Sequence, residues 1–364
     1  MNRCVRASFM GWRKAVASAA VTAVSVASIA MVFEAASEGA QTPTAPLRTT
    51  MAPTGASPAD SGRPPRTPWD DPDLQGIYTS STHTPMERPA ELEGKQFFTE
   101  EEAAAYVQAR QKELLQQPGD NIHYDDAVWQ SERTPTGLSS LRTSLVVDPP
   151  DGRIPPLTSE AERRVKTQAE VRRRSPADSP ESRLLSERCI TWRHEGPPML
   201  VAAYASIYQI VQAPGYVAIL QEMVHNVRII PLDGRENLSG RIRQYGGESR
   251  GRWEGETLVV EVTNFNDRTD FRGSANIRSE ELRVLERFTR IDRDTILYQF
   301  TVDDPRTWTK PWSAEFALMS TEGPVFEYAC HEGNYGLANI LSAARVQQGP
   351  EAPEQKNPQR TNGR

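Results

Sequence analysis

The sequence lacks the short motifs that assign many enzymes to a reaction class. Its 364 residues contain no phosphate-binding P-loop and no glycine-rich dinucleotide fingerprint. It also lacks the basic excess of an electrostatic nucleic-acid binder, since 42 Lys and Arg face 48 Asp and Glu. We therefore expect no nucleotide cofactor and no nucleic-acid partner.

The first 40 residues resemble a secretory signal peptide. Basic residues between Arg3 and Lys14 precede an uncharged stretch over residues 15–33 that is rich in Ala and Val. Many Ala, Ser and Thr residues make this stretch only weakly apolar, which favours a cleaved signal over a stable membrane span. The sequence thus predicts a periplasmic or secreted protein, with an uncleaved N-terminal anchor as the alternative.

Cysteine is scarce, and the positions of its three copies are informative. Cys4 lies in the predicted signal peptide, which leaves Cys189 and Cys330 in the exported chain. An even number of cysteines in an oxidising compartment favours a disulfide between these two residues. Two buried free thiols are the alternative.

Composition divides the remaining chain into three parts. Residues 41–68 hold seven prolines among small polar residues, and residues 346–364 are rich in Pro, Gln and Asn. Both segments have too few large apolar residues to build a core, so we predict a disordered linker and a disordered tail. A single globular domain is expected over residues 69–345.

Three segments of this domain carry helix signals. Thr99 and Glu102 form a capping box at the start of a helix predicted over residues 100–117. Similar capping residues predict a polar helix over residues 159–174, and a shorter helix is expected over residues 337–345.

Much of the remaining domain alternates between apolar and polar residues, the pattern of half-buried strands. Turn residues separate these runs, which predicts an antiparallel meander. Between Ala205 and Cys330 there is room for about eight strands, enough for a small lipocalin-like barrel or a sandwich. We expect a mainly β fold with a barrel over residues 201–345, while residues 69–200 wrap its outside or cap one mouth. The clearest inward-facing sets are Leu258, Val260 and Val262; Ile296, Tyr298, Phe300 and Val302; and Trp312, Ala314, Phe316 and Leu318.

Four sequence blocks resemble a large family of exported, uncharacterised bacterial proteins. The likeness extends over about residues 70–345 and implies a shared fold and a shared pocket. It implies no substrate, because the family has no established reaction. The blocks are R-T-S-L-V-V-D-P-P-D-G-R-I-P-P-L from Arg142, S-R-G-R-W-E-G-E-T-L-V-V from Ser249, T-V-D-D-P-R-T-W-T-K-P-W from Thr301 and Y-A-C-H-E-G-N-Y-G from Tyr328.

One departure from this family bears on metal binding. Members often carry H-E-M-x-H where this chain has Gln221 at the first position and His225 at the last. The surrounding residues alternate like a strand, in which these two positions lie about 13 Å apart. Because the first histidine is also absent, we exclude a zinc-protease motif. A single divalent metal elsewhere in the domain stays open.

Residues 330–335 gather an imidazole, a carboxylate, an amide and a phenol. His331 and Glu332 suit a metal-ligand pair or a general acid/base pair, and Asn334 and Tyr335 suit substrate binding. The alternative is structural, with Asn334 and Glu332 capping the last helix and His331 bound to a backbone carbonyl.

Three residues on predicted strands are further candidates. His225 follows an apolar alternation, as a catalytic group or as a hydrogen-bonded core residue. Glu286 shares a strand face with Val284 and Phe288, so its carboxylate acts as a general base or is neutralised by a buried arginine such as Arg228. Arg228 also suits two-pronged binding of an anionic substrate, as do other strand arginines, unless they only shield the surface. These others are Arg250, Arg252 and Arg272.

These features predict an exported enzyme that acts on a small organic or carbohydrate-derived molecule in a barrel pocket. Acid/base proton transfer would drive hydrolysis, elimination or isomerisation. A lipocalin-like carrier is the first alternative, although an aromatic content of 7% slightly disfavours it. A structural protein of the cell envelope is the second alternative.

Overall fold

The computed structural model describes residues 65–115, 135, 137–202, 204–268 and 278–349. The predicted signal peptide, most of the predicted linker and the end of the tail lie outside these residues. The described strands are β1 (Gly76–Thr79), β2 (Val146–Asp148), β3 (Ile207–Ala213), β4 (Tyr216–Gln221), β5 (Val227–Pro231), β6 (Glu248–Glu254), β7 (Thr257–Thr263), β8 (Arg283–Arg290), β9 (Thr295–Asp303) and β10 (Trp312–Ser320). The helices are α1 (Glu100–Leu115), α3 (Ser159–Arg174) and α4 (Tyr335–Gln348), with 3₁₀ turns η1 (Ala90–Leu92), η2 (Pro180–Ser182) and η3 (Met223–His225).

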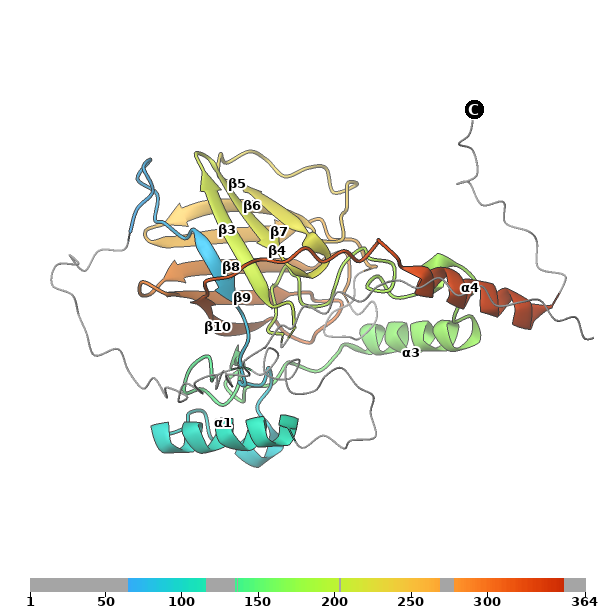
Figure 1. The fold of residues 1–364 in the computed structure, drawn as a ribbon, viewed down its shortest axis with the longest axis horizontal. Helices are drawn as coiled ribbons and strands as arrows, with labels where there is room; N and C mark the ends of the chain where they lie inside the picture. The colour runs from blue at the N-terminus through green and yellow to red at the C-terminus, as the bar shows by residue number, and fades with distance from the viewer. Residues whose placement is uncertain (1–64, 116–134, 136, 203, 269–277, 350–364) are drawn as a thin grey trace, which may run out of the picture. The chain divides into compact units, whose positions relative to one another are not determined.

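The strands form one antiparallel sheet that curls into a nearly closed barrel (Figure 1). Neighbouring strands follow the order β5-β4-β3-β1-β10-β9-β8-β7-β6, and β2 pairs with β10 beside this path. The eight strands expected between Ala205 and Cys330 are β3 to β10, which confirms the mainly β barrel. The N-terminal region contributes more than expected, because β1 lies within the ladder between β3 and β10.

The barrel has one seam, where β5 and β6 lie against each other without a ladder among the described residues. All neighbouring strands in the order from β5 to β6 are antiparallel, so the strand direction reverses from each strand to the next. The number of reversals is even, and β5 and β6 therefore run parallel to each other. A parallel pair cannot be joined by a hairpin, which explains the long connection over residues 232–247.

Gly251 on β6 allows the two strands of the seam to approach closely. A Cβ atom at this position would lie 2.7 Å from Ile230 Cγ2 and 2.6 Å from Leu232 Cδ2. Glycine therefore lets the side chains of β5 and of the following residue pack directly on the backbone of β6.

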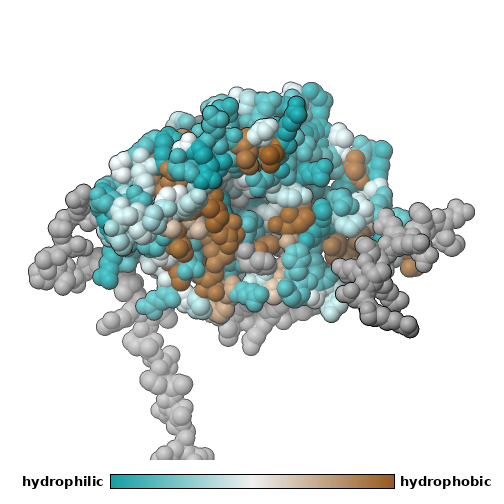
Figure 2. Space-filling view, turned by 90° about the horizontal axis from the view of Figure 1, so that it is seen from above, coloured by the Kyte–Doolittle hydropathy of each residue, from teal (hydrophilic) through white to brown (hydrophobic). Residues whose placement is uncertain are grey.

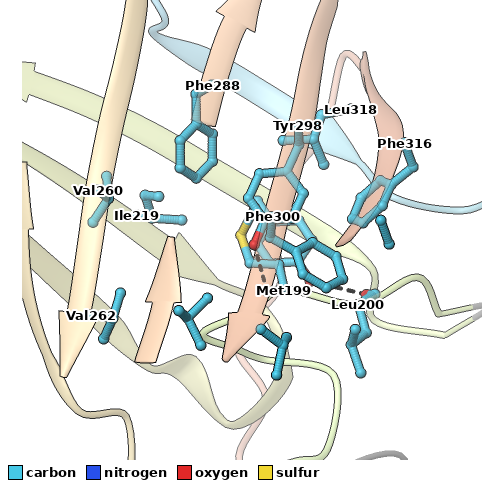
Figure 3. Close-up of a cluster of buried hydrophobic side chains, with 14 of the residues drawn as sticks. Met199, Leu200, Ile219, Val260, Val262, Phe288, Tyr298, Phe300, Phe316 and Leu318 are labelled. Atoms are coloured by element: carbon cyan, nitrogen blue, oxygen red, sulfur yellow. Dashed lines mark hydrogen bonds between the residues drawn. The ribbon is translucent and has the colours of Figure 1, made fainter. Parts of the chain in front are cut away.

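Side chains fill much of the barrel interior. Tyr298 packs against three phenylalanines, with ring centroids 4.8 Å from Phe288, 5.1 Å from Phe316 and 5.6 Å from Phe300 (Figure 3). Met199, from the loop before β3, enters the same cluster and donates its backbone N–H to the Tyr298 hydroxyl at 2.9 Å. The inward-facing residues expected on β7, β9 and β10 are all buried.

The three predicted helices are present and lie outside the barrel (Figure 1). The capping box forms as expected, because Thr99 N donates to Glu102 Oε2 at 2.8 Å and Glu102 N donates to Thr99 Oγ1 at 3.3 Å. At the start of α3, Thr158 Oγ1 accepts a hydrogen bond from Ala161 N at 3.1 Å. The Cys189–Cys330 disulfide is formed, which confirms that prediction.

The outer faces of β3, β4 and β5 carry exposed apolar side chains. Val211, Ala218 and Ile229 lie side by side across the three strands, and Val227 is exposed on β5. Figure 2 shows apolar residues gathered in a brown stripe among hydrophilic surroundings on the side of the barrel seen from above. None of the helices described is both long and apolar enough for a membrane span.

Candidate functional site at the barrel seam

A cavity of about 460 Å³ opens where β5 meets β6. Residues of β4, β5 and β6 line it together with parts of the loops before β3 and before β6. Tyr216, Val227 and Ile229 contribute apolar side chains that are exposed at its rim, whereas Gln221 and Arg228 are polar lining residues from the inner side of the barrel. Both apolar and polar side chains therefore line the cavity, and its volume suits a small organic molecule.

Arg228 and Glu286 form an ion pair across the barrel. Nη1 of Arg228 donates to both carboxylate oxygens of Glu286, at 3.1 Å and 2.9 Å, and the Tyr298 hydroxyl donates to Glu286 Oε1 at 2.6 Å. The Glu286 side chain is 0% exposed and that of Arg228 is 16% exposed. The structure thus confirms the expected alternative of a buried pair for Glu286.

Tyr298 stays protonated in this arrangement. Burial raises the pKa of its phenol well above the ordinary value, and the neighbouring Glu286 carboxylate raises it further. A neutral hydroxyl is the form that can donate a hydrogen bond to Glu286, so Tyr298 and Arg228 together satisfy the buried carboxylate.

One nitrogen of the Arg228 guanidinium takes no part in these hydrogen bonds. Its Nη2 atom is buried and has no hydrogen-bond partner among the described residues. An unmade hydrogen bond of a buried charged group costs about 1–3 kcal/mol or more, so this nitrogen favours an additional acceptor. Arg228 is therefore the lining residue best suited to bind an anion.

The other charged residues of the cavity have partners within the protein. Arg235 donates to Asp233 and to the Tyr216 hydroxyl, and Arg250 pairs with Glu248. The Arg235 guanidinium lowers the pKa of Asp233 to about 2, so this exposed pair stays charged. The Nε atom of Arg250 is also buried without a partner among the described residues, but Arg250 lies on the outer face of β6, opposite the exposed Glu261. Arg228 is therefore the main anion-binding group on the inner side of the cavity.

Beside the cavity, a second polar layer crosses the same end of the barrel. The buried Tyr208 hydroxyl donates to the His194 carbonyl at 3.2 Å and accepts from Gln221 Nε2 at 3.4 Å. The His194 side chain is also buried, and desolvation lowers its pKa to about 4, so it is neutral at neutral pH. The carboxylate of the next residue, Glu195, lines the cavity.

His225 lies next to this layer, although not on a strand as the alternation predicts. β4 ends at Gln221, and the chain turns through η3 with Val224 in the left-handed region at φ 58°. The placement of the His225 side chain lies outside the described part of the structure, as does all of Arg272. The turn brings Gln221 and Asn226 to the cavity, joined by a backbone hydrogen bond of 2.9 Å.

Residues 330–335 do not line this cavity. Asn334 caps α4, since its Oδ1 accepts a hydrogen bond from Leu337 N at 3.3 Å, and Tyr335 is 75% exposed. His331 and Glu332 are exposed as well. The apolar strand expected before Cys330 is absent, because residues 321–330 belong to no strand. The structural alternative holds for Asn334.

Some residues of the site are not among those that the sequence predicts. Glu195 lies in a loop without any periodic pattern, so no sequence signal marks it. Ser249 could have been found, because it alternates with Gly251 and Trp253 on the inner face of β6.

No three His, Cys, Asp or Glu side chains of the described residues come together in a group that could hold a metal ion. Comparison of the chain with protein-family models, curated proteins and solved structures gives no match.

Proposed function

We propose that the protein binds a small organic molecule that carries a planar anionic group, such as a carboxylate, in the seam cavity. The unpartnered Nη2 of Arg228 carries this proposal, because it is a buried, positively charged donor on a residue that lines the cavity. A guanidinium matches the geometry of a carboxylate. The apolar rim suits the remainder of such a molecule.

Glu286 acts in this proposal as a positioning residue. Both of its oxygens already accept hydrogen bonds, from Arg228 and Tyr298, and its side chain is fully buried. It fixes the guanidinium in one orientation instead of taking a proton from a ligand.

Enzymatic proton transfer is the second candidate function, and Glu195 favours it. This carboxylate lines the same cavity as Arg228, and its Oε2 accepts a hydrogen bond of 2.6 Å from Thr191. A carboxylate close to a bound anion can act as an acid or base. We expect NMR to detect conversion of a uronate or a hydroxy acid by the wild type and no conversion by Glu195→Gln. If the wild type converts neither of these compounds, enzymatic proton transfer is excluded.

The protein is further proposed to act outside the cytoplasm. The disulfide between Cys189 and Cys330 supports this location, because such bonds persist in oxidising compartments. The signal-like N-terminus supports it independently.

Calorimetric titration with benzoate tests the binding proposal, with neutral benzamide as the matched ligand. Arg228→Met alone would leave the buried Glu286 carboxylate without its positively charged partner, so this substitution is combined with Glu286→Gln. We expect Glu286→Gln to keep benzoate binding within about tenfold, and the double variant to lose it. Benzamide should bind weakly to all three proteins. Equal affinity of the wild type for benzoate and benzamide, or full binding by the double variant, would overturn the proposal.

A further inference from the structure

The seam places a second polar residue beside Arg228. Because β5 and β6 run parallel and Gly251 lies against Ile230, the positions two residues earlier on each strand also lie next to each other. These positions are Arg228 on β5 and Ser249 on β6, and both residues line the cavity.

Ser249 points to the inner side of the barrel. Its ladder partner on β7 is Val262, a fully buried core residue, so the two side chains share the inner face. Ser249 is only 6% exposed. Its Oγ atom is buried and has no hydrogen-bond partner among the described residues. A buried hydroxyl without a hydrogen-bond partner is unfavourable, although less so than an unpaired charged nitrogen such as Nη2 of Arg228.

Within the described part of the chain, Arg228 Nη2 and Ser249 Oγ are thus two buried donors without partners on residues that line one cavity, and they lie on the two strands that no ladder joins. We propose that Ser249 is the second anion-binding residue, and that the bound carboxylate bridges Arg228 Nη2 and Ser249 Oγ across the seam. This inference rests on the proposed function. The ligand would then supply the polar link between β5 and β6 that the backbone does not provide.

This bridge also accounts for the choice of a planar anion with two oxygens. One carboxylate oxygen can accept from the guanidinium of Arg228 while the other accepts from the hydroxyl of Ser249. A neutral amide offers only one acceptor oxygen. Its NH₂ group would lie against the second donor of the protein and could not accept a hydrogen bond from it. The pair of residues therefore discriminates carboxylates from amides of the same shape.

Titration of Ser249→Ala with benzoate tests this inference. Loss of one hydrogen bond to a charged ligand is expected to weaken benzoate binding about tenfold. Ser249→Thr keeps the hydroxyl and should bind within a few-fold of the wild type, which guards against a misfolded alanine variant. Ser313→Ala is the matched control, because Ser313 lies on a strand, does not line the cavity and bonds Thr301 at 2.8 Å.

Hydrogen exchange gives a second readout. Benzoate should slow amide exchange in both β5 and β6 of the wild type, and only in β5 of Ser249→Ala. If the wild type binds benzoate and Ser249→Ala binds it equally well, the bridge is wrong although the proposed function stands. If the wild type does not bind benzoate at all, the proposed function itself fails.

Discussion

At the scale of single residues, the Arg228–Glu286 pair is the feature that most needs an explanation. Removing two charges from water is costly, and well-packed apolar residues of the same volume often stabilise a fold equally well or better. Three hydrogen bonds satisfy Glu286, yet one nitrogen of Arg228 is unsatisfied. The pair is therefore better explained by binding than by stability.

His194 provides a test of the buried polar layer next to the site. Its pKa is about 4 in the folded protein, against about 6.5 in an unfolded chain, so the unfolded chain takes up a proton first as the pH falls. Stability should therefore decrease between about pH 6.5 and pH 4, and this residue should cost about 2 kcal/mol at pH 5 relative to pH 7.

Urea unfolding at pH 7 and pH 5 measures this effect. His194→Gln should reduce the difference between the two pH values by about 2 kcal/mol. His331→Gln, which replaces an exposed imidazole, is the matched control. An unchanged pH dependence in His194→Gln would show that His194 is not held neutral by burial.

At the scale of strands, the seam depends on the absence of a side chain at Gly251. In Gly251→Ala, the new methyl group would overlap with Ile230 and Leu232, which must shift. Overpacking of this kind costs about 1–3 kcal/mol. We expect a corresponding loss in the free energy of unfolding, together with weaker benzoate binding because Arg228 and Ser249 move apart.

Gly240→Ala is the control for this substitution. A Cβ atom at Gly240 would meet only Asn264 Oδ1, at 4.0 Å, so the change should leave both stability and binding nearly unaltered. Equal unfolding free energies for the two alanine variants would contradict the close packing of β5 on β6.

Local patterns predicted most of the elements because local physics determines them. The Thr99–Glu102 capping box marked α1, and the alternation of Ile296, Tyr298 and Phe300 marked a strand with one buried face. The alternation after Tyr216 was misleading beyond Gln221, because the chain turns there at Val224. Alternating hydropathy alone does not reveal such a turn.

The site was predictable only in part, for a related reason. A carboxylate on an apolar strand face requires a partner, which made the pairing of Glu286 with Arg228 predictable. The cavity itself arises from the parallel contact of β5 with β6, and this contact depends on the order of strands in the closed sheet. The strand order includes β1, which lies far away in the sequence, so no local pattern showed that Ser249 lies beside Arg228.

At the scale of the whole molecule, the N-terminal and C-terminal parts both take part in the barrel region. Residues before β3 supply β1, β2 and Met199 to the barrel, and the Cys189–Cys330 disulfide ties the segment after β10 to the loop before β3. This loop continues to Glu195 and the cavity. Covalent and noncovalent links from distant parts of the chain thus hold the wall of the proposed site.

A crystal structure with 4-bromobenzoate tests the central claim most directly, because anomalous scattering from bromine locates the ligand without ambiguity. We expect the bromine near the apolar rim formed by Tyr216 and Ile229, and the carboxylate about 3 Å from Arg228 Nη2 and Ser249 Oγ. A bromine site elsewhere, or a carboxylate in the cavity that makes no contact with Arg228, would contradict the proposed binding function.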